Sequence, residues 1–283
     1  MTSDVPMNIS SLPRKARPLA LAIPFFVAAA AATEGQPPAS QMLEIPAGEL
    51  QTLACPDLAR ICDPSEYVER TVPIKAFKLA AMEVTFAQWD ACVADGGCHE
   101  ESSGWAYRNR EVHPPCVAGE VCQYPFDEGW GRGERPVVHV SWEDVQRYLS
   151  WLNAKTEQTY RLPTSEEWEY AALAGADSRF PWGDALDPEM LNCNGCAGDW
   201  GGVQSAPVGS FPANRFGLHD MLGNVSEWVS SCVPLNEPGS QQCTSYLYRG
   251  GAWSFDAPNI DPRRVNWNYA EFRAPFLGFR VAQ

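Results

Sequence analysis

The chain has 283 residues, a formal net charge of −14 and 45% hydrophobic residues, including 11 Trp and 12 Phe. That apolar content is ample for a packed core and excludes a disordered chain. The negative charge and the lack of a basic stripe argue against a nucleic-acid partner. The numerous Pro (24) and Gly (22) residues predict a loop-rich fold with few long regular elements.

The N-terminal residues have the pattern of a secretory signal. Arg14, Lys15 and Arg17 form a positive segment, and the apolar run over 18–32 ends in a stretch of alanines, as is typical before a cleavage point. The run is short for a membrane span, although a retained anchor stays open. We expect a signal peptide over 1–32, a linker over 33–41 and one domain over 42–283. That domain should be secreted or periplasmic, with no stable membrane insertion after cleavage.

The ten cysteines fall into neighbouring pairs along the chain. The pairs are Cys55/Cys62, Cys92/Cys98, Cys116/Cys122, Cys193/Cys196 and Cys232/Cys243. An even count in an exported chain is most simply a set of disulfides, each closing a short loop. The Cys193-x-x-Cys196 pair has an alternative, a redox or metal-binding dithiol.

The first elements are two strands and a helix. We expect one strand over 42–50, a loop over 51–70 and a half-buried strand over 71–79, where apolar residues alternate. A helix should follow Thr85, because Thr85 and Gln88 form a capping box, and it should end at Gly96-Gly97. Residues 98–135 are then expected to form a long irregular insert.

Two further helices have equally clear starts. Ser141 with Asp144 begins one, whose Trp142, Val145, Leu149 and Leu152 lie on a single apolar face. Thr164 with Glu167 begins the other, and Gly175 ends it. Beyond Phe180 we expect mostly turns, until strands over 247–253 and 278–282 close the domain.

The stretch Gly217–Trp228 places two carboxylates, Asp220 and Glu227, around the dipeptide Gly223-Asn224. Gly and Asn accept positive φ at little cost, so a tight turn is expected. The turn should point the carbonyls of Gly223 and Val225 the same way as the two flanking carboxylates, and hard oxygen donors that converge in this way suit Ca²⁺. From this spacing alone, a solvated turn with its acids facing water is the alternative.

A series of motifs in one order carries a family resemblance. They are Phe77–Trp89, Pro136–Trp142, Arg161–Ala172, Phe180–Gly183, Ala206–Gly209, Gly223–Trp228, Arg249–Trp253 and Leu277–Ala282. Together they resemble the formylglycine-generating enzyme (sulfatase-modifying factor) family, collinearly from about Leu43 to the C-terminus. Several motifs in order are far more specific than any one of them.

The resemblance implies an α+β fold that is irregular, loop-rich and C-type-lectin-like, with few helices, short strands and bound Ca²⁺. In the family one calcium is held at positions that here are Asp220, Gly223, Val225 and Glu227. A second calcium would use Asn192 and the carbonyl of Cys193. Its carboxylate has Asp199 as the nearest candidate, one or two places from the family's position.

The same resemblance locates the family's copper-binding cysteine pair, four residues after the Gly-Gly pair and five residues further on. Counted from Gly251, those positions hold Phe255 and Ile260. Cu(I) requires soft thiolate ligands, and neither side chain can bind a metal. We therefore expect no copper and no formylglycine-generating activity.

Other candidate metal and acid–base residues have simpler explanations. The histidines (His99, His113, His139 and His219) are scattered, which argues against an iron site. Glu83, Glu143 and Glu166 stand near helix starts, where the helix dipole favours an acid.

Aromatic and polar residues gather near the position of the missing cysteine pair. The candidate ligand-binding residues are Trp253, Phe255, Arg263, Arg264, Asn266, Trp267 and Tyr269. Flat rings among amide and guanidinium donors suit a peptide, protein or glycan ligand, whereas simple core packing of these rings is the alternative. We interpret the chain as a calcium-stabilised binding or accessory module. The rival hypothesis is an enzyme with altered oxidase or transferase chemistry on a peptide or a small amine-bearing substrate.

Overall fold

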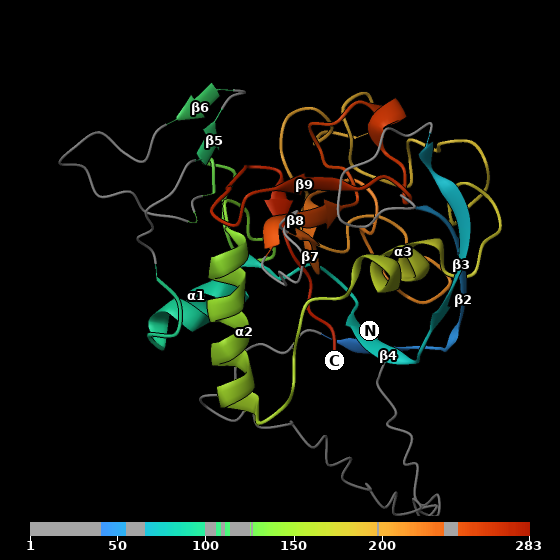
Figure 1. Cartoon of the computed structure of the whole chain (residues 1–283). Coiled ribbons are helices and arrows are strands. Elements are labelled where there is room, and N and C mark those ends of the chain that lie inside the picture. The colour runs from blue at the N-terminus through green and yellow to red at the C-terminus, as the bar shows by residue number, and fades with distance from the viewer. Residues whose placement is uncertain are drawn as a thin grey trace, which may run out of the picture. The chain divides into compact units, whose positions relative to one another are not determined.

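The computed structural model describes residues 41–54, 66–99, 106–108, 111–113, 125, 127–196, 198–234 and 243–283. These residues belong to one compact unit, Gly35–Gln283 (Figure 1). The signal peptide expected over 1–32, and the linker expected over 33–41 apart from its last residue, lie outside the described residues. In the described part of the chain, no helix combines the length and apolar character that crossing a bilayer requires.

The N-terminal part forms two antiparallel pairs of strands. Strands β1 (Met42–Ile45) and β4 (Phe77–Ala80) pair, as do β2 (Gly48–Ala54) and β3 (Val68–Ile74). The single strand predicted over 42–50 is wrong, because the chain breaks at Pro46, which has no N–H for a ladder. The strand predicted over 71–79 is likewise divided between β3 and β4. The loop predicted over 51–70 is too long, since β2 and β3 occupy both of its ends.

The three predicted helices are confirmed together with their caps. They are α1 (Phe86–Ala94), α2 (Trp142–Thr156) and α3 (Ser165–Leu173). Each begins with a complete capping box, made by Thr85 and Gln88, by Ser141 and Asp144, and by Thr164 and Glu167. Their positions are therefore fixed by local sequence.

A four-stranded sheet in the order β10-β7-β8-β9 forms the centre of the domain (Figure 1). Its strands are β7 (Ser226–Pro234), β8 (Cys243–Arg249), β9 (Asn266–Asn268) and β10 (Leu277–Gly278). The prediction of turns from 180 to 246 is wrong for β7, and β9 was not predicted. Strand β8 ends before 250 because Gly250 and Gly251 have positive φ, and β10 is shorter than the strand predicted over 278–282. Strands β5 (Ala106–Arg108) and β6 (Glu111–His113) pair antiparallel within the insert predicted to be irregular.

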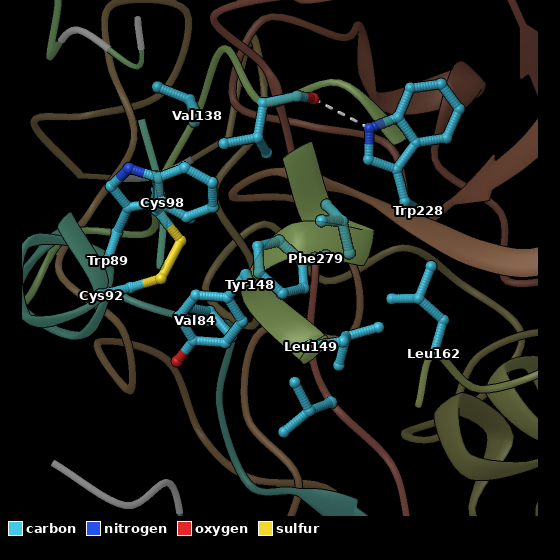
Figure 2. Packing of buried hydrophobic residues seen from close by; sticks show 14 of the residues in the cluster. Val84, Trp89, Cys92, Cys98, Val138, Tyr148, Leu149, Leu162, Trp228 and Phe279 are labelled. Carbon is cyan, nitrogen blue, oxygen red and sulfur yellow. Dashed lines mark hydrogen bonds between the residues drawn. A yellow bond between two sulfur atoms is a disulfide. The ribbon is translucent and has the colours of Figure 1, made fainter. Parts of the chain in front are cut away.

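Two hydrophobic clusters make up the core, and β7 contributes to both. Trp228 packs into the cluster that contains Trp89, Tyr148 and Phe279, whereas Val229 packs into the other. Figure 2 shows part of the first cluster, where Trp89 lies beside the Cys92–Cys98 disulfide and the indole of Trp228 donates a hydrogen bond. Alternate residues of a strand face opposite sides, so β7 separates two interiors. A charged residue on β7 is consequently surrounded by core.

Three of the predicted disulfides are confirmed. Cys92 is bonded to Cys98, Cys193 to Cys196, and Cys232 to Cys243. The metal-binding alternative for Cys193 and Cys196 is not supported, because their sulfur atoms are bonded to each other. The redox alternative stays a prediction, since a redox pair is also bonded in its oxidised state. The pairs Cys55/Cys62 and Cys116/Cys122 lie outside the described residues and stay predictions.

Candidate functional site

Glu227 lies on the face of β7 that it shares with Val229, where it meets Arg280 and Trp168. Its Oε1 accepts hydrogen bonds from Nε of Arg280 at 2.9 Å and from Nη2 at 2.7 Å. Its Oε2 accepts from the same Nε at 2.8 Å and from the indole of Trp168 at 2.7 Å. Both side chains of this ion pair are fully buried. The carboxylate of Glu227 is therefore already well satisfied.

Arg280 also ties two separate backbone segments to its own. Its guanidinium donates to the carbonyls of Ala80, Ala81 and His219. Burial opposes its charge, but the contact with Glu227 raises the pKa of Arg280 above its ordinary value. Arg280 therefore keeps its positive charge inside the core.

The turn before β7 has the predicted geometry. Gly223 has φ 76° and Asn224 has φ 51°. The Asn224 side chain donates to Oε1 of Glu83 at 3.0 Å and accepts from the backbone of Ala206 at 2.8 Å. Glu83, assigned from the sequence to a helix start, is only 1% exposed and takes no part in the α1 capping box. That interpretation of Glu83 is wrong, because Asn224 binds it within the core.

Asp220 is the other carboxylate beside this turn, and it is 6% exposed. Its Oδ2 accepts from the backbone of Gly209 at 2.6 Å, whereas its Oδ1 is buried with no hydrogen-bond partner among the described residues. Burial raises the pKa of Asp220 to about 6. The solvated-turn alternative is wrong, since both acids of the motif are inside the protein. Calcium ligation by Asp220, Glu227 and the carbonyls of Gly223 and Val225 stays a prediction.

The residues proposed for a second calcium have different surroundings. Asn192 is 1% exposed and donates to the carbonyl of Gln204, whereas Asp199 is exposed. The carbonyl of Cys193 accepts from the backbone of Cys196 at 3.0 Å. Nothing in this geometry adds to the expectation of a second calcium, which stays a prediction.

In the described ranges, no three His, Cys, Asp or Glu side chains are arranged to hold a metal by themselves. His139 is buried against Glu128, with 2.8 Å between Nε2 and Oε1, and the ring of His219 contacts the carbonyl of Phe211. Any cation here must therefore draw on amide or carbonyl oxygens as well as carboxylates.

The positions counted for the copper-binding pair lie in apolar surroundings. Ile260 is fully buried, and Phe255 is half-buried with its ring 5.3 Å from that of Phe276. These side chains present only carbon atoms, so the pair does not fit a copper ion.

The predicted ligand-binding residues do not form one surface. Trp253 and Phe255 are half-buried, and the ring of Trp253 lies edge-on to Trp130. Arg263 donates to the carbonyls of Ser178 and Arg179, which ties down a loop.

The exposed members of that set lie at edge strand β9. Trp267 and Tyr269 are 41% and 62% exposed, with ring centroids 6.5 Å apart. Asn266 pairs with Tyr248 of β8, and exposed Arg264 donates to the side chain of Asn259. The available ligand surface is therefore smaller than the sequence predicted.

A comparison with protein families identifies the family of this chain. The sequence profile of the sulfatase-modifying factor enzyme 1-like domain matches residues 27–283. The chain belongs to this family. The fold expected from the motif resemblance is thereby confirmed.

The relatives that this chain matches include proteins with several different named activities. A hercynine oxygenase of Mycolicibacterium thermoresistibile is 32% identical over 77% of this chain and 53% of its own length. A mouse protein named inactive C-alpha-formylglycine-generating enzyme 2 is 35% identical over 75% of this chain and 77% of its own. The formylglycine-generating enzyme of Bos taurus is 30% identical over 86% and 78%. The chain spans about half the length of the hercynine oxygenases that it matches.

Solved structures support the same fold. PvdO from Pseudomonas aeruginosa has a TM-score of 0.68 and 28% identity, covering 85% of this chain and 93% of its own. Treponema denticola variable protein 1 has a TM-score of 0.60 at 20% identity, covering 85% of this chain and 94% of its own, and shows the fold alone. The irregular α+β architecture is therefore shared by the sulfatase-modifying factor family and by more distant chains.

Sequence reasoning missed the partners of the predicted calcium motif. Arg280 and Trp168 were quoted only as parts of family motifs, and Glu83 was given another role. The sequence did contain one indication of these partners. Arg280 is a single charged residue with apolar neighbours on both sides, Phe279 and Val281. Charged residues are almost never buried unless paired, so that pattern points to a buried ion pair.

Proposed function

We propose that this protein is an exported binding or accessory module of the sulfatase-modifying factor family that lacks copper-dependent formylglycine-generating activity. The observation that carries the proposal is the presence of Phe255 and Ile260, both in apolar packing, at the positions counted for the copper-binding cysteines. A mouse relative whose name calls it inactive supports the same direction. Export rests on the signal-like N-terminus together with the disulfides.

The protein is expected to produce no formylglycine from a cysteine-containing sulfatase-type peptide, with or without added Cu(I). Loss of both soft ligands removes a metal site outright, so residual weak turnover is not expected. The measurement is mass spectrometry of the peptide after incubation, which detects the aldehyde product by its mass. An active formylglycine-generating enzyme is the positive control. Turnover of any kind would contradict the proposal, and replacement of Cys232 and Cys243 would show whether these cysteines are responsible for it.

The proposed ligand surface is the exposed edge at β9, formed by Trp267, Tyr269 and Arg264. Exposed rings supply contact area at low entropic cost, and a guanidinium adds a charged donor. An edge strand also offers unpaired backbone groups to an extended peptide. The ligand class that fits is therefore a peptide, a protein segment or a glycan.

Replacing Trp267 and Tyr269 with Ala is expected to abolish binding to any probe that the wild-type protein captures from an array of defined oligosaccharides and peptides. Loss of a central aromatic contact commonly costs about 2 kcal/mol or more in binding. Leu53→Ala is the matched control, because Leu53 is 46% exposed on β2. Equal loss in the control, or unchanged binding in the double variant, would move the ligand surface elsewhere.

Calcium is the proposed stabilising cofactor of the module. Its support is the excess of buried carboxylates around the Gly223-Asn224 turn, where Oδ1 of Asp220 has no partner in the described part of the chain. Hard oxygen ligands in irregular geometry are what Ca²⁺ uses. The role proposed for the calcium ion is to stabilise the fold. It is not a substitute for copper, because the positions counted for the copper ligands offer no metal-binding side chain.

Exhaustive chelation is expected to lower the melting temperature of the purified protein. A ligand that binds only the native state raises the free energy of unfolding by about 2.7 kcal/mol at a hundredfold excess over its dissociation constant. The measurement is a thermal melt before and after chelation, with calcium restored as the reversal control. An unchanged melt would remove calcium from the proposal.

An enzyme with altered chemistry is the second candidate. The similarity to hercynine oxygenases favours it, although this chain spans 53% of the M. thermoresistibile relative. Iron or copper at stoichiometric levels in the purified protein would support this candidate over the binding module.

A further inference from the structure

Three acidic side chains and one arginine lie together in the interior, so their charges do not cancel. Glu83, Asp220 and Glu227 are 1%, 6% and 0% exposed, and Arg280 is 0% exposed. Among the described residues, Arg280 is the one cationic side chain that hydrogen-bonds any of the three acids. An ionised buried carboxylate without a partner is costly, so the excess negative charge needs a cation or a proton.

Glu227 is the acid that Arg280 neutralises. Each of its oxygens accepts two hydrogen bonds, and one of these comes from Trp168. A carboxylate oxygen has about two lone pairs to offer. Glu227 therefore has little capacity left for a metal ion.

Glu83 and Asp220 each use one oxygen and leave the other without a partner. Asn224 donates to Oε1 of Glu83, and the backbone of Gly209 donates to Oδ2 of Asp220. Oε2 of Glu83 and Oδ1 of Asp220 are buried and have no hydrogen-bond partner in the described ranges. Such groups are rare in native structures, where an ion, a proton or a bound water usually completes them.

A third oxygen of the same kind belongs to Asn192. Its Oδ1 is also buried without a partner among the described residues, while its Nδ2 lies 3.5 Å from Oδ1 of Asn224. Asn224 thus joins Asn192 to Glu83. The backbone of His219 donates to the carbonyl of Ala81 at 2.9 Å, which brings the segments that carry Asp220 and Glu83 side by side.

We infer that the cation of this site is held by Glu83 and Asp220, with Asn192 contributing an amide oxygen. Glu227 does not bind the cation, because it forms an ion pair with Arg280. The inference rests on the proposed calcium binding and revises which residues perform it. Two carboxylates and an amide oxygen are hard ligands, and they suit a divalent ion that prefers oxygen ligands, such as Ca²⁺. The segment before α1 is thereby fixed to the turn before β7 by the ion.

The test is calcium and terbium binding by the chelator-treated full protein and by two variants. The probes are Ca²⁺ alone, followed by calorimetry, and Tb³⁺, followed by luminescence sensitised by tryptophan. Mutation of a residue that only supports a metal ligand weakens metal affinity by roughly tenfold. Glu83→Gln should weaken calcium affinity by more than that, because Glu83 binds the ion directly. It should also raise the melting temperature of the calcium-free protein, because it removes an uncompensated buried charge.

The matched control is Glu169→Gln. Glu169 is 1% exposed and also has one buried oxygen without a partner among the described residues, but Arg249 pairs with its other oxygen at 3.1 Å. This variant should bind calcium like the wild-type protein. If Glu83→Gln does not fold, Asp220→Asn replaces it with the same expected loss.

The outcomes separate the inference from the proposed calcium binding. Calcium affinity that is unchanged in Glu83→Gln but lost in Glu227→Gln would overturn the inference and leave a calcium site standing. Wild-type protein that binds neither ion would mean that Glu83 and Asp220 share a proton only, which overturns both. The formylglycine assay is independent of either result.

Discussion

Replacing Arg280 with Met is expected to lower the free energy of unfolding more than any other single change at the candidate site. The variant leaves the fully buried carboxylate of Glu227 with only the indole of Trp168 as a partner. Removing one member of a buried ion pair costs about 3–5 kcal/mol. It also removes the donors that hold the carbonyls of Ala80 and His219. Urea unfolding of the chelator-treated protein measures the loss without interference from calcium.

Two comparisons test the cause of that loss. The double variant Arg280→Met/Glu227→Gln should recover part of the stability, because the unpaired charge is gone and Trp168 keeps an oxygen acceptor. Lys78→Met is the control for an exposed pair, since Lys78 and Glu44 are 45% and 76% exposed. Such a pair is worth about 0–1 kcal/mol. Similar losses for Lys78→Met and Arg280→Met would contradict the assigned role of Arg280.

Replacing Gly223 with Ala is the change with the second-largest expected effect. Gly223 has φ 76°, a conformation that costs a non-glycine residue about 1–3 kcal/mol. A Cβ there would also collide with the backbone carbonyl of Asn192, which cannot turn aside as a flexible side chain would. Crowding of this kind adds about 1–3 kcal/mol. Thermal unfolding should show a much lower melting temperature.

Gly96→Ala separates the two contributions. Gly96 has φ 77°, almost the same as Gly223, but a Cβ at this position meets nothing within 4 Å. This variant should therefore show the conformational cost alone. Equal destabilisation by the two substitutions would mean that the contact between Gly223 and Asn192 contributes nothing.

The helices were predictable because their determinants are local. Thr85, Ser141 and Thr164 each lie three residues before the side chain that completes a capping box, and all three boxes are present. The Gly223-Asn224 turn was predictable for the same reason, since both residues tolerate positive φ. Family membership likewise followed from short motifs in a fixed order, and residues 27–283 match the family.

The longest strand of the central sheet was not predictable in this way. Strand β7 begins at Ser226, inside a stretch that resembles a turn, and its first part, 226–229, is buried on both faces. A strand between two interiors has no polar alternation, so its pattern does not differ from that of other buried segments. Its pairing with β8 and β10 comes from residues distant in sequence.

The sequence by itself determined the helices, the turn, the three neighbouring cysteine pairs that the structure describes and the absence of cysteine at the counted copper positions, because each depends on residues close together in the chain. Only the tertiary structure decided how the acids are used. Glu227 meets an arginine 53 residues away and Glu83 meets an asparagine 141 residues away. Whether a buried carboxylate is neutralised by a guanidinium or left for a cation depends on which distant side chains the fold brings to it, and local spacing carries no information about that.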